Sequence, residues 1–348
     1  MSAATDAADA DTPLFYLRDT PSAGRALFAA RDAPPDTLLL CADDLAASVI
    51  FREYRKEVCA QCFAYDRGVE WKTREPTGFA FCGVACRSAW HEGADASAKL
   101  AYEALHAFTA HNHGDRDDAD IHDMTTLTRP GAAEIDRAWN ESVIETAAIL
   151  AARVRPQQTK ADARRLRHAL VTPPVPDTIN FLLSGVLCHA GRQGDWAEVT
   201  KLHSCAEPYV SAQDLQQHLD AQRHLLALLP PRLLDAVSPA VLHTVVSRAA
   251  QNSFSIRSTD DGGSEIFGYG IWPSASYFNH SCRPNVRKMR VGRAWHFSTS
   301  QHVKVGDELC ISYLGGDEDD LDGARRRQRL SSFWGFDCGC IRCSASDT

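Results

Sequence analysis

The stretch that decides the fold lies at residues 276–285 and reads SYFNHSCRPN. Its first half contains the aromatic residues Tyr277 and Phe278, its second half is mostly polar, and Pro284 fixes the backbone so that the chain turns there. Asn279 and His280 offer polar groups just before this turn. From these residues alone the stretch predicts a polar elbow, and an ordinary turn explains it as well as a binding site does.

The cysteines are the next informative feature, because seven of the twelve gather in two clusters. The first cluster consists of two pairs, whose members are separated by two and by three residues: Cys59, Cys62, Cys82 and Cys86. Four thiolates in two such pairs are typical of a structural zinc site. The second cluster gives three thiolates within six residues: Cys338, Cys340 and Cys343. A zinc ion there needs a fourth ligand, and spacing does not choose among the other five cysteines.

The overall composition excludes several classes of protein. Of the 348 residues, 44% are hydrophobic and 24% are charged, which excludes a wholly disordered or collagen-like chain. No apolar run reaches the roughly 18 residues of a membrane-spanning helix, and residues 1–13 lack the basic and apolar parts of a signal peptide. The net charge of −8 disfavours broad binding to nucleic-acid phosphates. Because clustered cysteines favour metal over disulfides in reducing compartments, we expect a protein of the nucleus, the cytoplasm or both.

The order of predicted elements gives an α+β fold. Short apolar runs predict strands near both ends of the chain, and residues 286–291 and 294–299 flank Gly292 as a predicted hairpin. The middle of the chain reads mostly helical, and Ser238-Pro239 predicts a helix start with Ser238 as the N-cap. The predicted segments are a disordered tail at 1–13, strands at 14–55, a zinc finger at 56–94, a helical insertion at 95–245, strands at 246–315 and a zinc segment at 316–348.

The elbow at 276–285 closely resembles the Asn-His-Ser-Cys-x-Pro-Asn signature of SET-domain lysine methyltransferases. Residues 306–313, GDELCISY, resemble the second SET signature, which ends in the catalytic tyrosine, and residues 24–27, GRAL, resemble the N-terminal glycine loop. Residues 252–256 and 268–273 match the run before the first signature in the SMYD family, which combines a SET domain with a MYND zinc finger. Because the large C-terminal helical domain of several animal members is missing, the chain looks most like the short fungal members.

The resemblance implies a β-rich SET core that is interrupted by a zinc finger and a helical insertion and followed by a post-SET zinc cluster. Residues 81–90, FCGVACRSAW, resemble part of a MYND finger. Only the first and third of its four ligand pairs are present, so the resemblance implies one zinc ion in this finger rather than two. It also selects Cys282 as the fourth ligand of the second cluster, which would tie the C-terminal segment across the active site.

The implied activity is protein-lysine N-methylation, with S-adenosylmethionine as methyl donor and a histone or non-histone protein as substrate. The resemblance gives Tyr313 the catalytic role. The implied cofactor-binding residues are Gly24, Arg25, Asn252, Asn279, His280 and Phe336, the last of these stacked on the adenine. The implied lysine channel is aromatic and consists of Phe254, Tyr269 and Trp334. We expect a monomer that binds neither membranes nor, directly, nucleic acid.

A second hypothesis is an interaction module built on a weak or inactive SET core. Two departures from the family pattern favour it: Ala26 stands where a glycine is usual, and Trp334 stands where many members have a tyrosine. The joint presence of Tyr313, Asn279 and His280 favours the enzyme.

The two sets of four cysteines predict two zinc ions per chain, one for each set of four thiolates. Elemental analysis of the purified protein measures this ratio, and a value near three, or near zero in intact protein, would contradict it. Cys82→Ser is expected to release one zinc ion and to destabilise the finger, because metal binding supplies much of the folding free energy of such small units.

Overall fold

The computed structural model describes residues 13–21, 23–112, 128–259, 265–315 and 320–344. The chain divides into two compact units, Met1–Asp43 with Ser274–Thr348 and Asp44–Pro273. Helices and short strands are mixed, so the predicted α+β class is confirmed. The predicted disordered tail, residues 1–13, lies outside the described residues except for Pro13.

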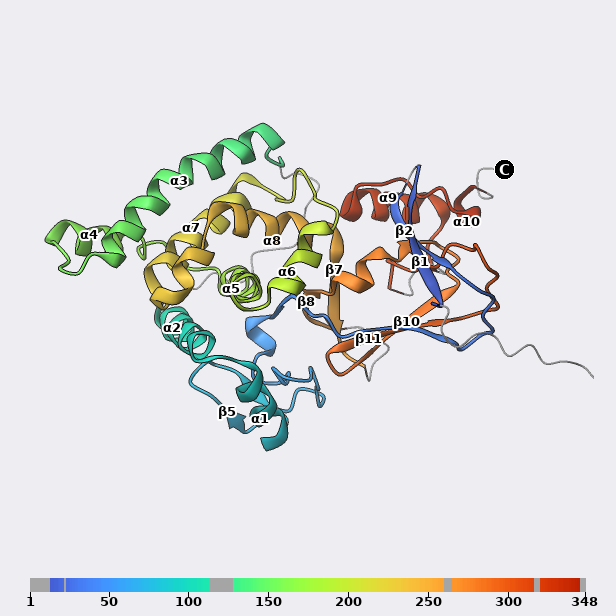
Figure 1. The fold of residues 1–348 in the computed structure, drawn as a ribbon, viewed down its shortest axis with the longest axis horizontal. Coiled ribbons are helices and arrows are strands. Elements are labelled where there is room, and N and C mark those ends of the chain that lie inside the picture. Colours follow the sequence, from blue (N-terminus) through green and yellow to red (C-terminus); the bar gives the residue numbers. More distant parts are fainter. Residues whose placement is uncertain (1–12, 22, 113–127, 260–264, 316–319, 345–348) are drawn as a thin grey trace, which may run out of the picture. The chain divides into compact units, whose positions relative to one another are not determined.

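Short strands build the first unit (Figure 1). A hairpin pairs β1 (Phe15–Thr20) with β2 (Gly24–Ala29), and a three-stranded antiparallel sheet has the order β10 (Val286–Val291), β11 (Ala294–Thr299) and β3 (Leu38–Ala42). The predicted hairpin around Gly292 is confirmed by β10 and β11. Trp295, Phe297 and Thr299 alternate on the buried face of β11, as the two-residue period of a strand requires.

The C-terminal part of the first unit is helical. It contains α9 (Gly323–Trp334) and the short α10 (Ile341–Ser344), which follow the turn η3 (Pro273–Tyr277) and the short strands described below. Asp322 caps the start of α9 by accepting a hydrogen bond from the Arg325 backbone N–H. Gly335 ends the helix in the left-handed region, with φ of 74°, where a glycine is strongly favoured. The helix therefore stops between two aromatic residues, Trp334 and Phe336.

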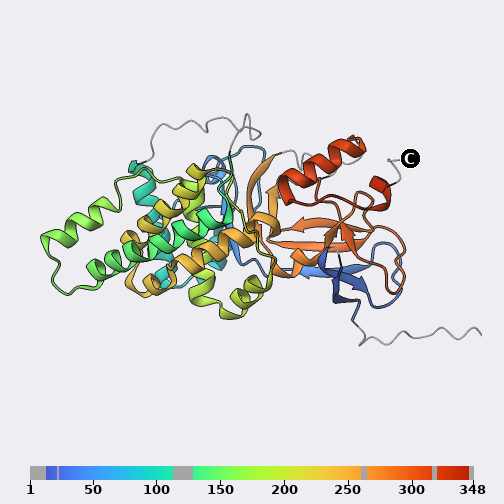
Figure 2. The same ribbon diagram turned by 90° about the horizontal axis from the view of Figure 1, so that it is seen from above.

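Seven helices make up most of the second unit (Figure 2): α2 (Ala96–Asn112), α3 (Ala132–Val154), α4 (Lys160–His168), α5 (Pro176–Gly191), α6 (Gln193–Lys201), α7 (Ala212–Leu228) and α8 (Pro239–Asn252), with the 3-10 turn η2 (Pro231–Ala236). The predicted start of α8 is confirmed, because the Ser238 hydroxyl accepts from the Val241 N–H. Among the described residues, none of the helices combines the length and apolar character that crossing a membrane requires.

Helix α5 is the centre of the second unit. It buries a run of apolar residues between Ile179 and Cys188, and it packs against α2, α6, α7, α8 and β4. A Cβ atom on its Gly185 would lie 2.4 Å from Val245 Cγ2, so α5 and α8 approach each other closely there. A helix that is apolar on most of its circumference is typical of a buried position.

The second unit also contains a three-stranded antiparallel sheet and the zinc finger. The sheet has the order β4 (Ala47–Ile50), β8 (Ile266–Ile271) and β7 (Ser253–Arg257). The turn η1 (Arg52–Tyr54) precedes the finger, which contains β5 (Thr73–Arg74), β6 (Ala80–Phe81) and α1 (Val84–Gly93). Arg55 joins the start of the finger to α5 through an ion pair of 2.9 Å with Asp177.

A substitution at Gly268 in β8 tests how closely β8 and β4 pack against each other. A Cβ atom there would lie 2.0 Å from the backbone oxygen of Val49 on β4, so Gly268→Ala must push the two strands apart. We expect a loss of about 3 kcal/mol in the free energy of unfolding, measured by chemical denaturation. The matched control is Gly194→Ala on the exposed face of α6, where an added Cβ meets no atom within 4 Å. It should be neutral or stabilise by up to about 1 kcal/mol, and equal effects of the two substitutions would contradict the prediction.

Candidate active site

The two signature stretches meet in a short parallel pair of strands. In β9 (Asn279–His280) and β12 (Cys310–Ile311), Asn279 pairs with Cys310 and His280 with Ile311. The ladder continues for one more bond, because the Ser281 N–H donates to the Ile311 oxygen at 3.0 Å. The pairing brings the elbow beside Tyr313, which follows β12 by two residues.

The side chain of Tyr313 is fixed by a hydrogen bond at its hydroxyl and by contacts of its ring. Its hydroxyl donates a hydrogen bond of 2.9 Å to the backbone oxygen of Phe278. The centroid of its ring lies 5.4 Å from the ring centroid of Trp334 and 6.3 Å from that of Phe336, which it meets edge-on. Burial raises the pKa of the phenol above its ordinary value, so the hydroxyl keeps its proton near pH 7. The site therefore presents a fixed, neutral hydroxyl among aromatic rings.

His280 connects Tyr313 to the second cysteine cluster. The backbone N–H of Tyr313 donates to Nδ1 at 3.0 Å, so Nε2 carries the proton, and it lies 3.2 Å from the Sγ atom of Cys282. Burial lowers the pKa of His280 to about 4, with help from the positive charges of Lys288 and Arg326, so the ring is neutral near pH 7. Both ring nitrogens of His280 contact groups of the protein itself. A ligand would therefore contact the main chain of His280 rather than its ring.

A network of amides and a carboxylate fixes the elbow. The Asn279 amide donates to Glu308 Oε1 at 2.9 Å. Asn285 joins both signatures, because its amide donates to the Glu308 backbone oxygen at 2.8 Å and its oxygen accepts from the Cys310 N–H at 2.9 Å. Sequence reasoning assigned no role to Asn285 or Glu308. Both lie inside the two signatures, and polar side chains beside buried strands need hydrogen-bond partners, so a signal for them was present.

Gly24 and Arg25 lie at the start of β2, in the same unit as Tyr313. Gly24 has a φ of 67°, which favours glycine, and a Cβ atom there would meet nothing within 4 Å. The Arg25 guanidinium lies over the ring of Tyr277, 4.9 Å from its centroid, and donates to its hydroxyl at 3.4 Å. Ala26 is fully buried, so its methyl group packs inside the unit.

The other three predicted site residues belong to the second unit. Asn252 is the last residue of α8, and its amide donates to the backbone oxygens of Arg248 at 2.7 Å and His203 at 3.0 Å. Phe254 on β7 is half-buried and meets the Trp272 ring edge-on at 6.3 Å. Tyr269 on β8 contacts the ring of Phe181 at 4.7 Å. Their roles in binding stay predictions.

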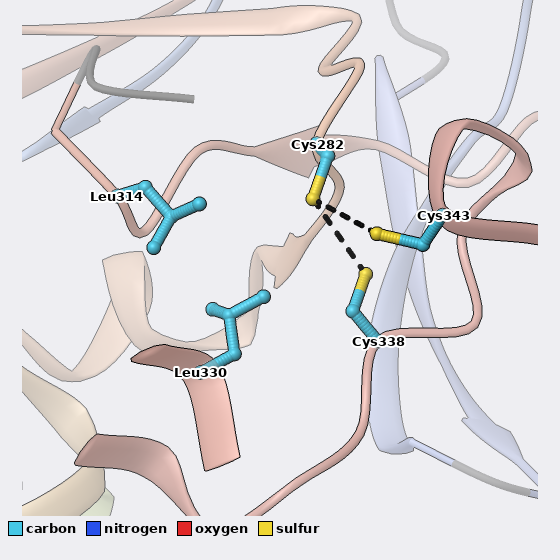
Figure 3. Packing of buried hydrophobic residues seen from close by; sticks show 5 residues of the cluster. All are labelled: Cys282, Leu314, Leu330, Cys338 and Cys343. Atoms are coloured by element: carbon cyan, nitrogen blue, oxygen red, sulfur yellow. Dashed lines mark hydrogen bonds between the residues drawn. The ribbon is translucent and has the colours of Figure 1, made fainter. Parts of the chain in front are cut away.

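The second cysteine cluster has the dimensions of a metal site. Figure 3 shows three of its members, Cys282, Cys338 and Cys343, with their side chains turned toward one another. The four sulfur atoms of the cluster lie within 4.8 Å of one another: Cys282, Cys338, Cys340 and Cys343. The Cys282 sulfur is 3.5 Å from that of Cys343 and 3.9 Å from that of Cys338. Tetrahedral zinc with Zn–S bonds of about 2.3 Å separates its sulfurs by about 3.8 Å, so the four thiols fit this ion. Leu314 and Leu330 are buried beside the cluster.

The first cysteine cluster, in the zinc finger, fits the same ion. Its four sulfur atoms also lie within 4.8 Å of one another: Cys59, Cys62, Cys82 and Cys86. The sulfur separations are 3.7 Å from Cys62 to Cys82 and 3.5 Å from Cys82 to Cys86. The hydrogen bond between the Cys59 and Cys62 side chains lowers the pKa of Cys59 and raises that of Cys62, so without a metal ion Cys59 is the thiolate and Cys62 keeps its proton. Phe81 and Trp90 are buried around Cys59.

Comparison with known proteins agrees with this geometry. A family model described as SET domain matches residues 24–314. A Saccharomyces cerevisiae protein named Potential protein lysine methyltransferase SET6 is 25% identical, and the match covers 96% of each chain. A SET and MYND domain-containing protein of Dictyostelium discoideum is 35% identical over 31% of this chain and 24% of its own length. The human Histone-lysine N-methyltransferase SMYD3 is 33% identical over 28% of this chain and 21% of its own length.

Asn285 provides a test of the network that joins the two signatures. Asn285→Ala removes two hydrogen bonds and leaves the Cys310 N–H and the Glu308 oxygen without their partner. We expect a loss of about 1–3 kcal/mol in the free energy of unfolding, measured by urea denaturation. Ser300→Ala is the control, since it removes only a 3.4 Å hydrogen bond from an exposed residue nearby and should change stability by less than about 0.5 kcal/mol. A similar effect of both substitutions would count against the bridging role.

Proposed function

Because this chain belongs to the SET domain family, whose model covers residues 24–314, we propose that it is an S-adenosylmethionine-dependent protein-lysine N-methyltransferase. The observation that carries the proposal is the fixed hydroxyl of Tyr313 among aromatic rings, beside the paired signature strands. The names of the yeast and human relatives support lysine methylation, the yeast one over 96% of both chains.

In this reaction the main task of the protein is to align the lysine amine with the methyl group that is transferred. When bound, S-adenosylmethionine supplies a methyl group on a positively charged sulfur, and a neutral lysine amine displaces the sulfur from that methyl carbon. Tyr313 is proposed to hold the amine and the methyl group in line with its hydroxyl, which the Phe278 carbonyl keeps in position. The neutral phenol can direct its oxygen lone pairs at the positive charge, and preorganised dipoles of this kind stabilise a transition state.

The aromatic rings around Tyr313 suit a lysine side chain. The Trp334 ring flanks Tyr313 and offers apolar surface, which disfavours the protonated amine before transfer. Aromatic faces also stabilise the methylated ammonium that forms. We extend the proposed channel to Phe254 and Tyr269, and the proposed cofactor contacts to Gly24, Arg25, Asn252, Asn279, the main chain of His280 and Phe336.

The two cysteine clusters are proposed to hold one structural zinc ion each. Cys282 belongs to the elbow, three residues after Asn279, and Cys338 follows Phe336 by two residues. An ion bound by the second cluster would therefore join the segment that carries Trp334 and Phe336 to the elbow. We propose a reducing compartment, the nucleus or the cytoplasm, because cysteines clustered for metal binding are typical of such compartments. We propose a protein substrate and a monomeric enzyme.

Tyr313→Phe tests the catalytic role. It removes the hydroxyl and keeps the ring, so turnover should fall on the order of 10²-fold or more while affinity for S-adenosylmethionine changes only a few-fold. The measurements are transfer of a tritiated methyl group to proteins of a cell lysate, with mass spectrometry of the labelled proteins, and calorimetric titration of the cofactor.

Asn279→Ala is the contrasting variant, since it should weaken cofactor binding before it changes turnover at saturation. Full turnover of Tyr313→Phe would refute the assigned role. Absence of cofactor binding by the unmodified protein at millimolar concentration would support the interaction module instead.

Trp334→Tyr tests whether the aromatic wall controls how many methyl groups are added. The substitution keeps a ring beside Tyr313 and adds a hydroxyl, so the ratio of mono- to higher-methylated product should shift more than cofactor affinity does. Mass spectrometry of one identified substrate gives this ratio. Phe333→Tyr is the matched control, because it adds the same hydroxyl to the neighbouring ring, which is 57% exposed. An equal product ratio in all three proteins would exclude this role for Trp334.

A further inference from the structure

Three side chains that can bind soft metal ions lie in one row across the β10–β11–β3 sheet of the first unit. In the register of this sheet, Met289 on β10 is paired with His296 on β11, and His296 is paired with Cys41 on β3. Directly paired residues of neighbouring strands point to the same face of a sheet. A thioether, an imidazole and a thiol therefore form one row, with neighbouring Cβ atoms about 4.5–5.5 Å apart.

The row stands on the solvent face of the sheet. The residues that precede and follow His296 on β11, Trp295 and Phe297, are both buried and point to the opposite face. Met289 is 60% exposed, Cys41 is exposed and His296 is half-buried. Within the described residues, no hydrogen bond or ion pair engages the side chains of these three residues.

The chemistry of the row selects one class of metal ion. Thiolate and thioether sulfurs favour soft ions such as Cu⁺, and imidazole also binds copper, whereas Mg²⁺ and Ca²⁺ need oxygen ligands. On β10 and β11 the pairs on either side of this one contain no carboxylate, since Arg287 faces Ser298 and Val291 faces Ala294, and the nearby Asp36 carboxylate is ion-paired with Arg287 at 2.6 Å. The three rotatable bonds of methionine allow its sulfur to lean toward the central imidazole.

We propose that Cys41, His296 and Met289 form a surface binding site for a soft monovalent metal ion, of which Cu⁺ is the biological example. The central imidazole and the two sulfurs beside it are the ligands. This site is separate from the two four-cysteine clusters, with which it shares no residue. It is independent of the proposed methyl transfer.

Methionine labelling gives a direct readout, because the chain has only three methionines. The full-length, zinc-loaded protein carrying ¹³C-labelled methionine methyl groups is titrated with Ag⁺, a soft ion that does not change its oxidation state here. The methyl signal of Met289, assigned with Met289→Leu, should shift with the first equivalent of Ag⁺. Zinc release, followed with a colorimetric chelator, should begin only at higher ratios. A shift that appears only as zinc leaves would overturn the proposal.

Variants of the row then test the ligands one at a time with Cu⁺ under a competing chelator. Cys41→Ser, His296→Asn and Met289→Leu should each weaken binding by about 10-fold to 100-fold or more, since even loss of an outer partner of a ligand has such an effect. All three should keep two zinc ions, which also shows that they fold. Cys205→Ser is the matched control, because this thiol is partly exposed in the other unit and should not change Cu⁺ affinity. Unchanged affinity in the row variants would refute the site.

Discussion

The pairing of Asn279 and His280 with Cys310 and Ile311 is the constraint on which the site depends. It is short, and the side chains around it supply the rest of its stability. Asn285 ties the two signatures through the Glu308 and Cys310 backbone, and His280 accepts from the backbone of Tyr313 while its other nitrogen faces Cys282. The orientation of Tyr313 is therefore coupled to the geometry of a cysteine cluster, although the two belong to different parts of the sequence.

Local signals in the sequence were sufficient for much of the fold. The β10–β11 hairpin and the start of α8 at Ser238-Pro239 were predicted correctly because turn and capping residues act over a few positions. The α+β class is confirmed, and the resemblance to the SMYD-type family is confirmed by the SET domain match and the yeast relative. The segment boundaries between these elements stay predictions.

The site was less accessible from sequence, because its contacts are non-local. Spacing left five candidates for the fourth ligand of the second cluster, and only the resemblance selected Cys282, whose sulfur the structure places with the other three. The bridging role of Asn285 depends on backbone groups 23 and 25 residues away, which no periodicity reveals. The use of both His280 nitrogens inside the fold likewise appears only when β9 and β12 are paired.

The second cysteine cluster has a consequence for the order of events during synthesis. A nascent chain emerges from the ribosome in sequence, and Cys343 follows Cys282 by 61 residues and follows every strand of both units. The signature strands can pair earlier, but the full set of thiols exists only after residue 343 has emerged. Binding of one metal ion by all four thiols therefore comes later than the pairing of the signature strands, and until residue 343 has emerged Tyr313 lacks the aromatic segment fastened beside it.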